Sequence, residues 1–505
     1  MKKLCLLFLM CCLSVWSMAA DDQIWITTGS DAFGDIAQTV GKRGPAYAMK
    51  VYAQRDGVTL TKVPGKRLGE ISEMMHEKHR RCGGFMAHAT YEDALASLAR
   101  ESMAASQKML VGYNIDNAAT VNPMLNGLDQ QNIEDTIFNL SNFYTRYHSS
   151  QTGTDAAIWI KAAWEDIAQS RSDITVSLYN HSGTSQPSVI LTIPGTTQAS
   201  EIVVIGGHLD SINGSTGRSP GADDNASGIA TITEILRTAI ANGYAPARTV
   251  KLMGYAAEEV GLVGSGEIAA AAVSNGDNVV GVVQFDMTNY NGSTPKIVMM
   301  TDYTNAAQNG FLGNLIDAYV GVDWAYDTCG YGCSDHASWN NRGFPASMPF
   351  EALMGQYNPT IHSANDTIAQ SGSNASHAMH FARLGVAYLA ELAKGGLNGD
   401  TGPGLPTTEN FSGSLGKNQE VVFGPFSVEA GSQFSASSTG TGNIDLYVGF
   451  GSAPTTSSSD CAGTSRNSTE SCSVTVPAGQ SVAYVMLRGT RKNNSYDLAV
   501  TYSAP

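Results

Sequence analysis

The chain has 505 residues, which is enough for two to four domains and a large buried core. It carries 30 Lys+Arg and 45 Asp+Glu, which gives a formal net charge of −15 at pH 7. We therefore expect no nucleic-acid partner, because phosphate recognition needs a basic surface. With 15% charged residues and 53 glycines, the composition also excludes a coiled coil and a charged disordered chain.

The first 19 residues have the features of a secretory signal peptide. A basic start at residues 1–3 precedes an apolar run at residues 4–16, and small residues follow. We expect cleavage after Ala19, with Ala20 as the alternative, and export of the protein. The apolar run is too short for a membrane span and no longer one follows, so we predict a secreted protein without a span.

Residues 20–106 are more basic than the rest and end in a helix-like stretch. A basic segment between a signal peptide and an acidic body favours a removable pro-segment, inhibitory or folding-assisting, over a small permanent domain. His76 and His79 are three residues apart rather than the four of a zinc-binding helix, so we interpret them as part of a solvated helix. Cys82 is interpreted as a buried structural thiol, and a thiolate that blocks a metal site is the alternative.

Residues 107–397 alternate apolar, β-rich runs with helical stretches. This alternation predicts an α/β fold, with a mixed, mostly parallel central sheet flanked by helices. The expected strands are 189–193, 202–206, 249–255, 279–285 and 296–301, and the expected helices are 155–169, 226–241 and 377–393.

The composition changes after residue 397. Residues 398–409 are rich in Gly and Pro and are interpreted as a linker, and residues 410–505 are dense in Ser, Thr and Gly. Short alternating runs predict a small all-β C-terminal sandwich. These runs are residues 421–426, 444–450, 472–476, 482–487 and 496–502.

Potential metal ligands follow several apolar strands of the middle domain. Each has an ordinary explanation as a loop histidine, a helix cap or a solvated acid, but the ends of buried central strands are crowded. Carboxylates gathered there repel one another, and a divalent cation relieves the repulsion. The residues are His208, Asp210, Asp224, Glu258, Glu259, Asp286 and His362.

The spacing of these residues indicates separate roles. His208 and Asp210 are two apart, so both lie on one side of an extended chain, which suits a histidine ligand oriented by a carboxylate. Glu258 and Glu259 are adjacent and point apart, so one can bind metal while the other transfers a proton.

Four of the eight cysteines form two local pairs. In an exported protein, Cys329 with Cys333 and Cys461 with Cys472 are predicted to form disulfides. The alternative for the first pair is a zinc knuckle completed by His336, but no second ligand pair lies nearby in the sequence.

The motifs together resemble the bacterial leucyl aminopeptidase family of secreted two-zinc exopeptidases, over about residues 130–368. The resemblance also implies the signal peptide, an inhibitory pro-segment and a pre-peptidase C-terminal β-sandwich. The motifs that carry the resemblance are GHLDS at residues 207–211, PGADD at 220–224, AAEEVG at 256–261, DMTNY at 286–290, DTCGY at 327–331, CSDHA at 333–337 and Ile-His at 361–362.

This resemblance implies a role for each ligand. One zinc ion would be held by His208 and Asp286, the other by Glu259 and His362, and Asp224 would bridge the two. Two zinc ions per catalytic domain are therefore expected. The other implied roles are Glu258 as general base, Asp210 as the residue that orients His208, and Tyr331 as an oxyanion stabiliser.

The resemblance further implies a pocket for a large apolar first residue such as Leu. Met354 stands where the family commonly has an aromatic residue, and Asn225 where it often has Asp after a cis peptide bond. The expected lining is Met287, Met348, Phe350, Met354, Tyr357 and Ile361.

We therefore predict a secreted, monomeric zinc aminopeptidase that acts on peptides or proteins with free N-termini. A carboxypeptidase or small-amide deacylase on the same fold is the alternative within enzymes, although no basic residue stands in the motifs to bind a substrate carboxylate. A secreted binding protein that has lost activity is the alternative from another class, and the presence of Glu258 argues against it.

Overall fold

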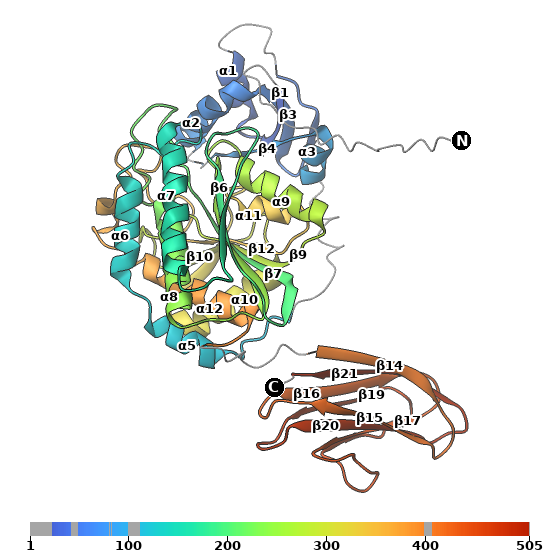
Figure 1. Ribbon diagram of the computed structural model, residues 1–505. Helices are drawn as coiled ribbons and strands as arrows, with labels where there is room; N and C mark the ends of the chain where they lie inside the picture. The colour runs from blue at the N-terminus through green and yellow to red at the C-terminus, as the bar shows by residue number, and fades with distance from the viewer. Residues whose placement is uncertain are drawn as a thin grey trace, which may run out of the picture.

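The structure is a computed structural model that describes residues 23–41, 49–79, 81, 83–98, 112–397 and 407–503. The expected signal peptide, Cys82 and most of the expected linker lie outside the described residues. Figure 1 shows an N-terminal segment, a central α/β domain and a C-terminal β-sandwich. Among the described residues, no helix combines the length and the apolar character needed to cross a bilayer.

The N-terminal segment, residues 23–98, has its own antiparallel sheet in the order β2-β3-β1-β4. Helix α2 buries Leu68, Ile71, Met74 and Met75 on one face. Its last residues, 76–79, were predicted to be solvated: residues 77 and 78 are exposed, and the two histidines are partly buried. The elements are β1 (Gln23–Gly29), α1 (Phe33–Gly41), β2 (Ala53–Arg55), β3 (Val58–Pro64), α2 (Leu68–His79), β4 (Phe85–His88) and α3 (Tyr91–Leu98).

The central domain is built on a six-stranded mixed sheet in the order β12-β9-β7-β8-β6-β5. Strands β12, β9, β7 and β8 run parallel, whereas β6 and β5 are antiparallel to their neighbours. The predicted mixed α/β fold is confirmed. The strands are β5 (Thr175–Tyr179), β6 (Ser188–Ile193), β7 (Gln198–His208), β8 (Arg248–Tyr255), β9 (Asn278–Gln284) and β12 (Ala346–Ser347).

A three-stranded sheet in the order β11-β10-β13 belongs to the same domain. Its strands are β10 (Ile297–Met300), β11 (Trp324–Asp327) and β13 (Pro349–Phe350). The helices of the domain are α5 (Ala118–Asn126), α6 (Gln130–Ser141), α7 (Gln151–Ala168), α8 (Ala226–Ala241), α9 (Val263–Asn275), α10 (Ala306–Leu315), α11 (His336–Asn340) and α12 (Ala378–Ala393).

Both faces of the large sheet are covered by helices because its central strands are apolar on both sides. Along β7, Val203 and Ile205 pack into the core formed with α6, α7, α8 and α12. Their neighbours Ile202 and Val204 pack on the opposite face with residues of α9 and α11. Since successive side chains of a strand point to opposite faces, a continuous apolar run produces this double burial.

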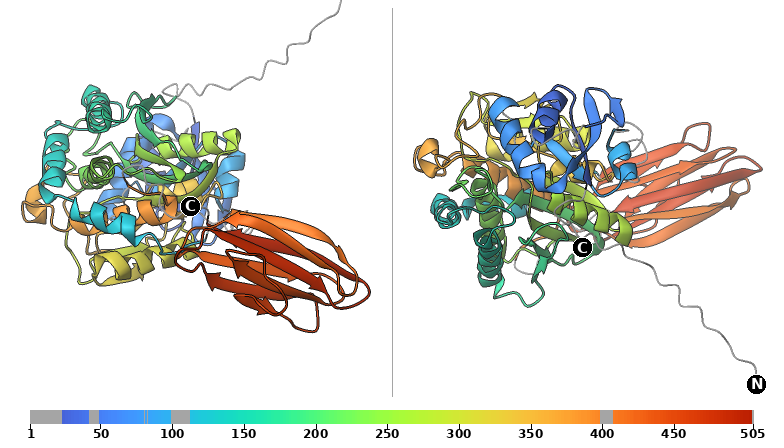
Figure 2. Two further views of the ribbon diagram at one scale, coloured as in Figure 1. Left: turned by 60° about the horizontal axis from the view of Figure 1, so that its bottom comes forward. Right: turned by 90° about the horizontal axis from the view of Figure 1, so that it is seen from above.

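The C-terminal sandwich consists of two four-stranded sheets, β14-β21-β16-β19 and β15-β20-β17-β18, seen as two layers in Figure 2. The predicted Cys461–Cys472 disulfide is present and joins β18 of one sheet to β19 of the other. The strands are β14 (Thr407–Leu415), β15 (Glu420–Ser427), β16 (Gln433–Thr439), β17 (Ile444–Phe450), β18 (Cys461–Gly463), β19 (Glu470–Thr475), β20 (Val482–Gly489) and β21 (Asn494–Tyr502).

The sandwich has a hydrophobic core that is separate from that of the central domain, because its buried cluster contains only side chains from residues 411–502. A domain with its own core folds on its own. Ending the chain at Leu397 is therefore expected to leave the melting temperature of the remaining protein unchanged within about 2 °C, as measured by calorimetry. A larger drop would show that the sandwich stabilises the central domain.

Candidate metal centre

The predicted metal ligands lie at one edge of the central sheet. Strands β9, β7 and β8 are parallel neighbours, so their carboxyl ends lie side by side. His208 is the last residue of β7, Glu258 and Glu259 follow β8, and Asp286 follows β9. Two loops supply the remaining ligands, which are Asp224 and His362.

The first group of ligand atoms consists of His208, Asp224 and Asp286. The Nε2 atom of His208 lies 3.1 Å from Oδ1 of Asp224 and 3.2 Å from Oδ1 of Asp286. The other oxygen of Asp286 accepts a hydrogen bond from the Ser334 hydroxyl at 2.5 Å. All three ligand side chains are buried.

The second group consists of Asp224, Glu259 and His362. The Nε2 atom of His362 lies 2.8 Å from Oε2 of Glu259 and 3.2 Å from Oδ2 of Asp224. Asp224 thus belongs to both groups and faces one imidazole with each carboxylate oxygen.

The spacing of these atoms fits a metal ion at the centre of each group. Zinc with ligands at its usual bond lengths in a tetrahedral arrangement separates neighbouring ligand atoms by roughly 3.3 Å. The separations of 3.1 and 3.2 Å around His208 and of 3.2 Å between His362 and Asp224 agree with that value, whereas the 2.8 Å between His362 and Glu259 is shorter. A single imidazole N–H can donate to only one of the two carboxylates that it faces, whereas a cation is bound by all three atoms.

The charge of the region also fits bound cations. Five carboxylates, each at most 2% exposed, are gathered around two imidazoles. Burial and the neighbouring Asp224 carboxylate raise the pKa of Glu259 to about 7 in the metal-free protein. A divalent cation removes this repulsion. The carboxylates are those of Asp210, Asp224, Glu258, Glu259 and Asp286.

Glu258 belongs to neither group of ligand atoms, and neither of its carboxylate oxygens accepts a hydrogen bond from any described residue. Its side chain is 1% exposed, and this burial raises the pKa of the carboxyl group well above its usual range. A buried carboxylate without a donor is poised to accept a proton.

The Asp210 carboxylate holds the turn that carries the two glutamates. It accepts hydrogen bonds from the backbone N–H groups of Glu258 at 3.0 Å and Glu259 at 3.2 Å. Nδ1 of His208 lies 3.1 Å from the Asp210 backbone carbonyl and 3.5 Å from its carboxylate. Asp210 therefore positions the backbone of Glu258 and Glu259 as well as the His208 imidazole that the sequence analysis connected with it.

Three residues of the site have left-handed backbone conformations although none is glycine. Ala257, directly before Glu258, has a φ of +55°, as do Met287, directly after Asp286, and His362 itself. Such a conformation costs of order 1–3 kcal/mol for a residue with a β-carbon, and the surrounding structure must maintain it. The peptide bond between Asp224 and Asn225 is cis, as the resemblance implied.

Two positioning residues were missed by the sequence analysis. The Arg146 guanidinium, 1% exposed, donates to the backbone carbonyls of Leu140, Leu209, Pro220 and Gly221. Burial lowers the pKa of Arg146 only to about 10, so its charge is retained near the carboxylates. The Asp366 carboxylate accepts the N–H groups of Asp223 and Asp224, both at 3.1 Å. Neither residue lies in a recognisable motif, and no sequence signal identifies them.

An apolar pocket opens beside the first group of ligands and is bordered by Asp286. Five of the six predicted pocket residues line it, together with Met300, Tyr331 and Cys333, while Ile361 packs in the same apolar cluster. Met300 was missed because nothing in the sequence indicates which residues of a short strand face a cavity. The five are Met287, Met348, Phe350, Met354 and Tyr357.

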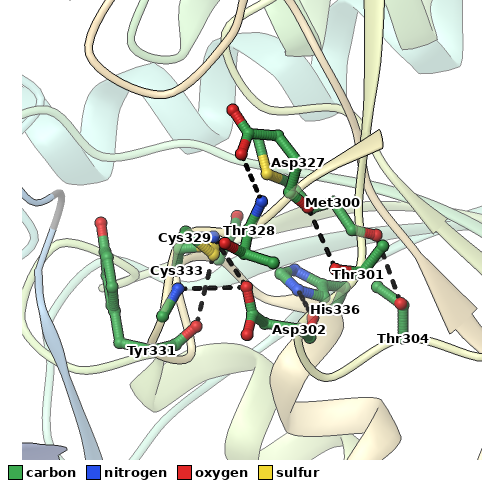
Figure 3. Close-up of a disulfide and its surroundings, with 12 residues drawn as sticks. Met300, Thr301, Asp302, Thr304, Asp327, Thr328, Cys329, Tyr331, Cys333 and His336 are labelled. Atoms are coloured by element: carbon green, nitrogen blue, oxygen red, sulfur yellow. Dashed lines mark hydrogen bonds between the residues drawn. A yellow bond between two sulfur atoms is a disulfide. The ribbon is translucent and has the colours of Figure 1, made fainter. Parts of the chain in front are cut away.

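The predicted Cys329–Cys333 disulfide forms part of the pocket wall and excludes the zinc-knuckle alternative (Figure 3). The Asp302 carboxylate accepts the N–H groups of Cys329 at 2.7 Å and Gly330 at 3.0 Å. Nε2 of His336, the third expected knuckle residue, lies 3.1 Å from the Asp302 backbone carbonyl. This network places Tyr331 at the pocket.

The N-terminal segment lies against the metal centre. The rings of His76 on α2 and His362 have their centroids 4.4 Å apart, and the Arg81 guanidinium lies 5.1 Å from the centre of the Tyr331 ring. The N–H of Ala87 donates to the carbonyl of Gly261 at 2.9 Å. Buried side chains of the segment form one apolar cluster with residues 257, 260 and 263 beside the glutamate turn.

Comparisons with known proteins identify similar domains and relatives. Residues 188–387 match Peptidase family M28, and residues 421–489 match the Bacterial pre-peptidase C-terminal domain. The chain is 38% identical over 299 residues to leucine aminopeptidase 1 of the fungus Arthroderma gypseum. This match covers 56% of this chain and 79% of the fungal protein.

Solved structures of Legionella pneumophila proteins are also similar. The LapA aminopeptidase is 30% identical, with a TM-score of 0.63, and the match covers 74% of this chain and 99% of LapA. LapB is 27% identical with the same TM-score, and the match covers 74% of this chain and all of LapB.

The four backbone carbonyls held by Arg146 lead to a stability prediction. Replacing Arg146 with Met removes every donor but keeps most of the volume, so we expect a loss of about 3 kcal/mol in unfolding free energy. Urea unfolding measures this, with Arg146→Lys as the variant that keeps the charge. A Met variant as stable as the unchanged protein would contradict this role.

Proposed function

Because the chain belongs to peptidase family M28 and is a zinc-dependent aminopeptidase, we propose that it holds two zinc ions in the centre formed by the two ligand groups. The observation that carries this proposal is the position of Asp224, whose two oxygens face His208 at 3.1 Å and His362 at 3.2 Å. Each group offers three protein ligands and leaves a position open, as catalytic zinc sites do.

Glu258 is the proposed general base. Zinc bound in such a centre acidifies water and polarises the peptide carbonyl. Glu258 accepts the proton of the attacking water and then donates it to the leaving amine. The backbone N–H bonds to Asp210 keep Glu258 in place for both transfers. Tyr331, at the pocket wall, is proposed to stabilise the oxyanion.

The pocket supports a preference for peptides with a large apolar first residue. Its lining offers four methionines, two tyrosines and one phenylalanine, and none of the lining residues is basic. The buried carboxylates beside it suit the positive charge of a free N-terminus. A carboxypeptidase would need a cation for the substrate carboxylate, so the aminopeptidase is favoured over that alternative.

Residues 20–106 are proposed to be an inhibitory pro-segment. The support is the position of its described part, where His76 lies against His362 and β4 bonds to the turn after the glutamates. Gly83 lies beside the same turn, since a β-carbon there would be 3.9 Å from the carbonyl oxygens of Glu258 and Glu259. Access to the centre therefore requires removal of the segment.

We further propose export of the protein and a monomeric mature enzyme of the bacterial leucyl aminopeptidase type. The signal-like first 19 residues and the two disulfides support export, since disulfides persist in oxidising compartments. The match of the β-sandwich to a bacterial pre-peptidase C-terminal domain supports the bacterial subgroup.

The Glu258→Gln variant tests the general base. We expect kcat for leucine p-nitroanilide to fall by about 10²- to 10⁴-fold, because the amide cannot accept the proton. KM and zinc content are expected to change little, since Glu258 is not a proposed ligand. A variant that keeps more than a tenth of kcat would exclude Glu258 as the base.

Metal analysis of the mature protein tests the number of ions. We expect two zinc ions per chain, loss of activity after chelation, and recovery when zinc is returned. The His362→Ala variant removes a ligand of one group only and is expected to retain close to one zinc ion per chain. A single zinc ion in the unchanged protein would contradict the two-metal proposal.

Cleavage between the N-terminal segment and the central domain tests inhibition. An interface worth about 3 kcal/mol leaves roughly 1% of the molecules open, so cleavage within residues 99–111 is expected to raise kcat/KM by about a hundredfold. Cleavage within residues 398–406, which releases the sandwich, is the matched control and is expected to cause no such rise. Equal activity before and after N-terminal cleavage would contradict inhibition.

A further inference from the structure

A second chain of acid, imidazole and hydroxyl groups lies outside the metal centre. Nδ1 of His181 is 2.8 Å from Oε2 of Glu267, and Nε2 of His181 is 2.7 Å from the Ser188 hydroxyl oxygen. The order of groups is that of a nucleophilic triad, but Ser188 is fully buried and cannot meet a substrate carbonyl. The hydrogen bonds between these three side chains can therefore serve only to hold parts of the protein in position.

Ser188, at the hydroxyl end of this series of hydrogen bonds, contacts the turn that carries the two glutamates. The Ser188 hydroxyl oxygen accepts the backbone N–H of Ala256 at 2.9 Å. Ala256 directly follows β8 and precedes the left-handed Ala257, after which come Glu258 and Glu259. The bond therefore fixes the backbone just before the left-handed Ala257.

The acid end reaches the other side of the same turn. Glu267 lies on α9, which begins at Val263, four residues after Glu259. The chain of bonds thus ties the helix that leaves the turn to the strand that enters it, through the first residue of β6. Ser182 donates a further hydrogen bond to Glu267 at 2.8 Å, outside this chain of bonds.

The hydrogens of these three side chains can be placed so that each polar group has a partner. Since the Ser188 oxygen accepts the Ala256 N–H, its own hydrogen is available to donate to Nε2 of His181. The remaining ring hydrogen then lies on Nδ1 and donates to the Glu267 carboxylate. Removal of His181 leaves a buried hydroxyl and a carboxylate oxygen without their partner.

We propose that Glu267, His181 and Ser188 form a positioning relay that holds Glu258 and Glu259 in place for catalysis and metal binding. The relay rests on the proposed roles of the two glutamates. It bonds to the backbone N–H of Ala256, before the two glutamates, whereas Asp210 accepts the backbone N–H groups of the glutamates themselves. None of the three relay residues lines the substrate pocket.

The relay predicts a separation of kcat from KM in the mature enzyme. For Ser188→Ala and Glu267→Ala we expect kcat for leucine p-nitroanilide to fall about tenfold, because small displacements of a catalytic group are costly. KM is expected to stay within about twofold because the pocket is unchanged. Zinc affinity of the weaker site is expected to fall about tenfold, measured by titration with a competing chelator.

Two control variants distinguish positioning from general loosening. Glu267→Gln keeps an acceptor for the His181 ring hydrogen and is expected to restore kcat to within about twofold of the unchanged enzyme. Ser182→Ala removes only the outer bond to Glu267 and is expected to behave like the unchanged enzyme. Glu267 is partly exposed, with 27% of its side chain accessible, so its variants test the relay even where Ser188→Ala does not fold.

The relay is wrong if folded Glu267→Ala keeps its kcat and zinc affinity, or if Ser182→Ala or Glu267→Gln loses as much as Glu267→Ala. Failure of the proposed function gives a different result, because the unchanged mature enzyme would then release no leucine in the same assay.

Discussion

The main constraint on this structure is the mutual repulsion of five carboxylates that are buried at one edge of the central sheet. Negative charges cannot share a dry site without shifting their pKa values or binding cations. The pKa of Glu259 is already raised to about 7 without metal. The fold therefore has to supply both the acids and the means of holding them together before zinc binds, and much of the surrounding architecture serves this purpose.

The acids are held mainly through their backbone rather than their side chains. Asp210 and Asp366 each accept two consecutive N–H groups, at the glutamate turn and at the turn that presents Asp224. Arg146 bonds to carbonyls of the loops that follow β7. The ligand side chains remain available to the metal because other groups fix the chain that carries them.

The sequence predicts the parts of the fold that depend on local patterns. The expected strand 202–206 lies within β7 and the expected helix 226–241 coincides with α8, because apolar runs and periodicity determine which faces are buried. Strand β16 was missed, since its alternating Ser and Ala residues have little apolar contrast. In the N-terminal segment, whose apolar face packs on another domain, the burial of α2 could not be inferred from the segment alone.

In the site, too, the residues in local sequence motifs could be predicted, whereas those that act through distant contacts could not. Residues proposed to carry the chemistry, such as His208 and Glu259, stand in compact motifs at or shortly after the ends of strands, and the structure places them in the two groups of ligand atoms. Arg146 and Asp366 act on backbone groups distant in sequence, and His181 is joined to the centre through two other residues. Contacts of this kind are made by the folded chain and leave no periodic signal.

The left-handed backbone at Ala257, Met287 and His362 has a further consequence. Glycine would adopt this conformation without cost, but it would visit several others as readily. A residue with a β-carbon has only a narrow left-handed minimum, so once the surrounding bonds place it there it has little room to move. The enzyme thus gives up some folding free energy for a centre with a restricted backbone, which would suit the two cations proposed to bind there.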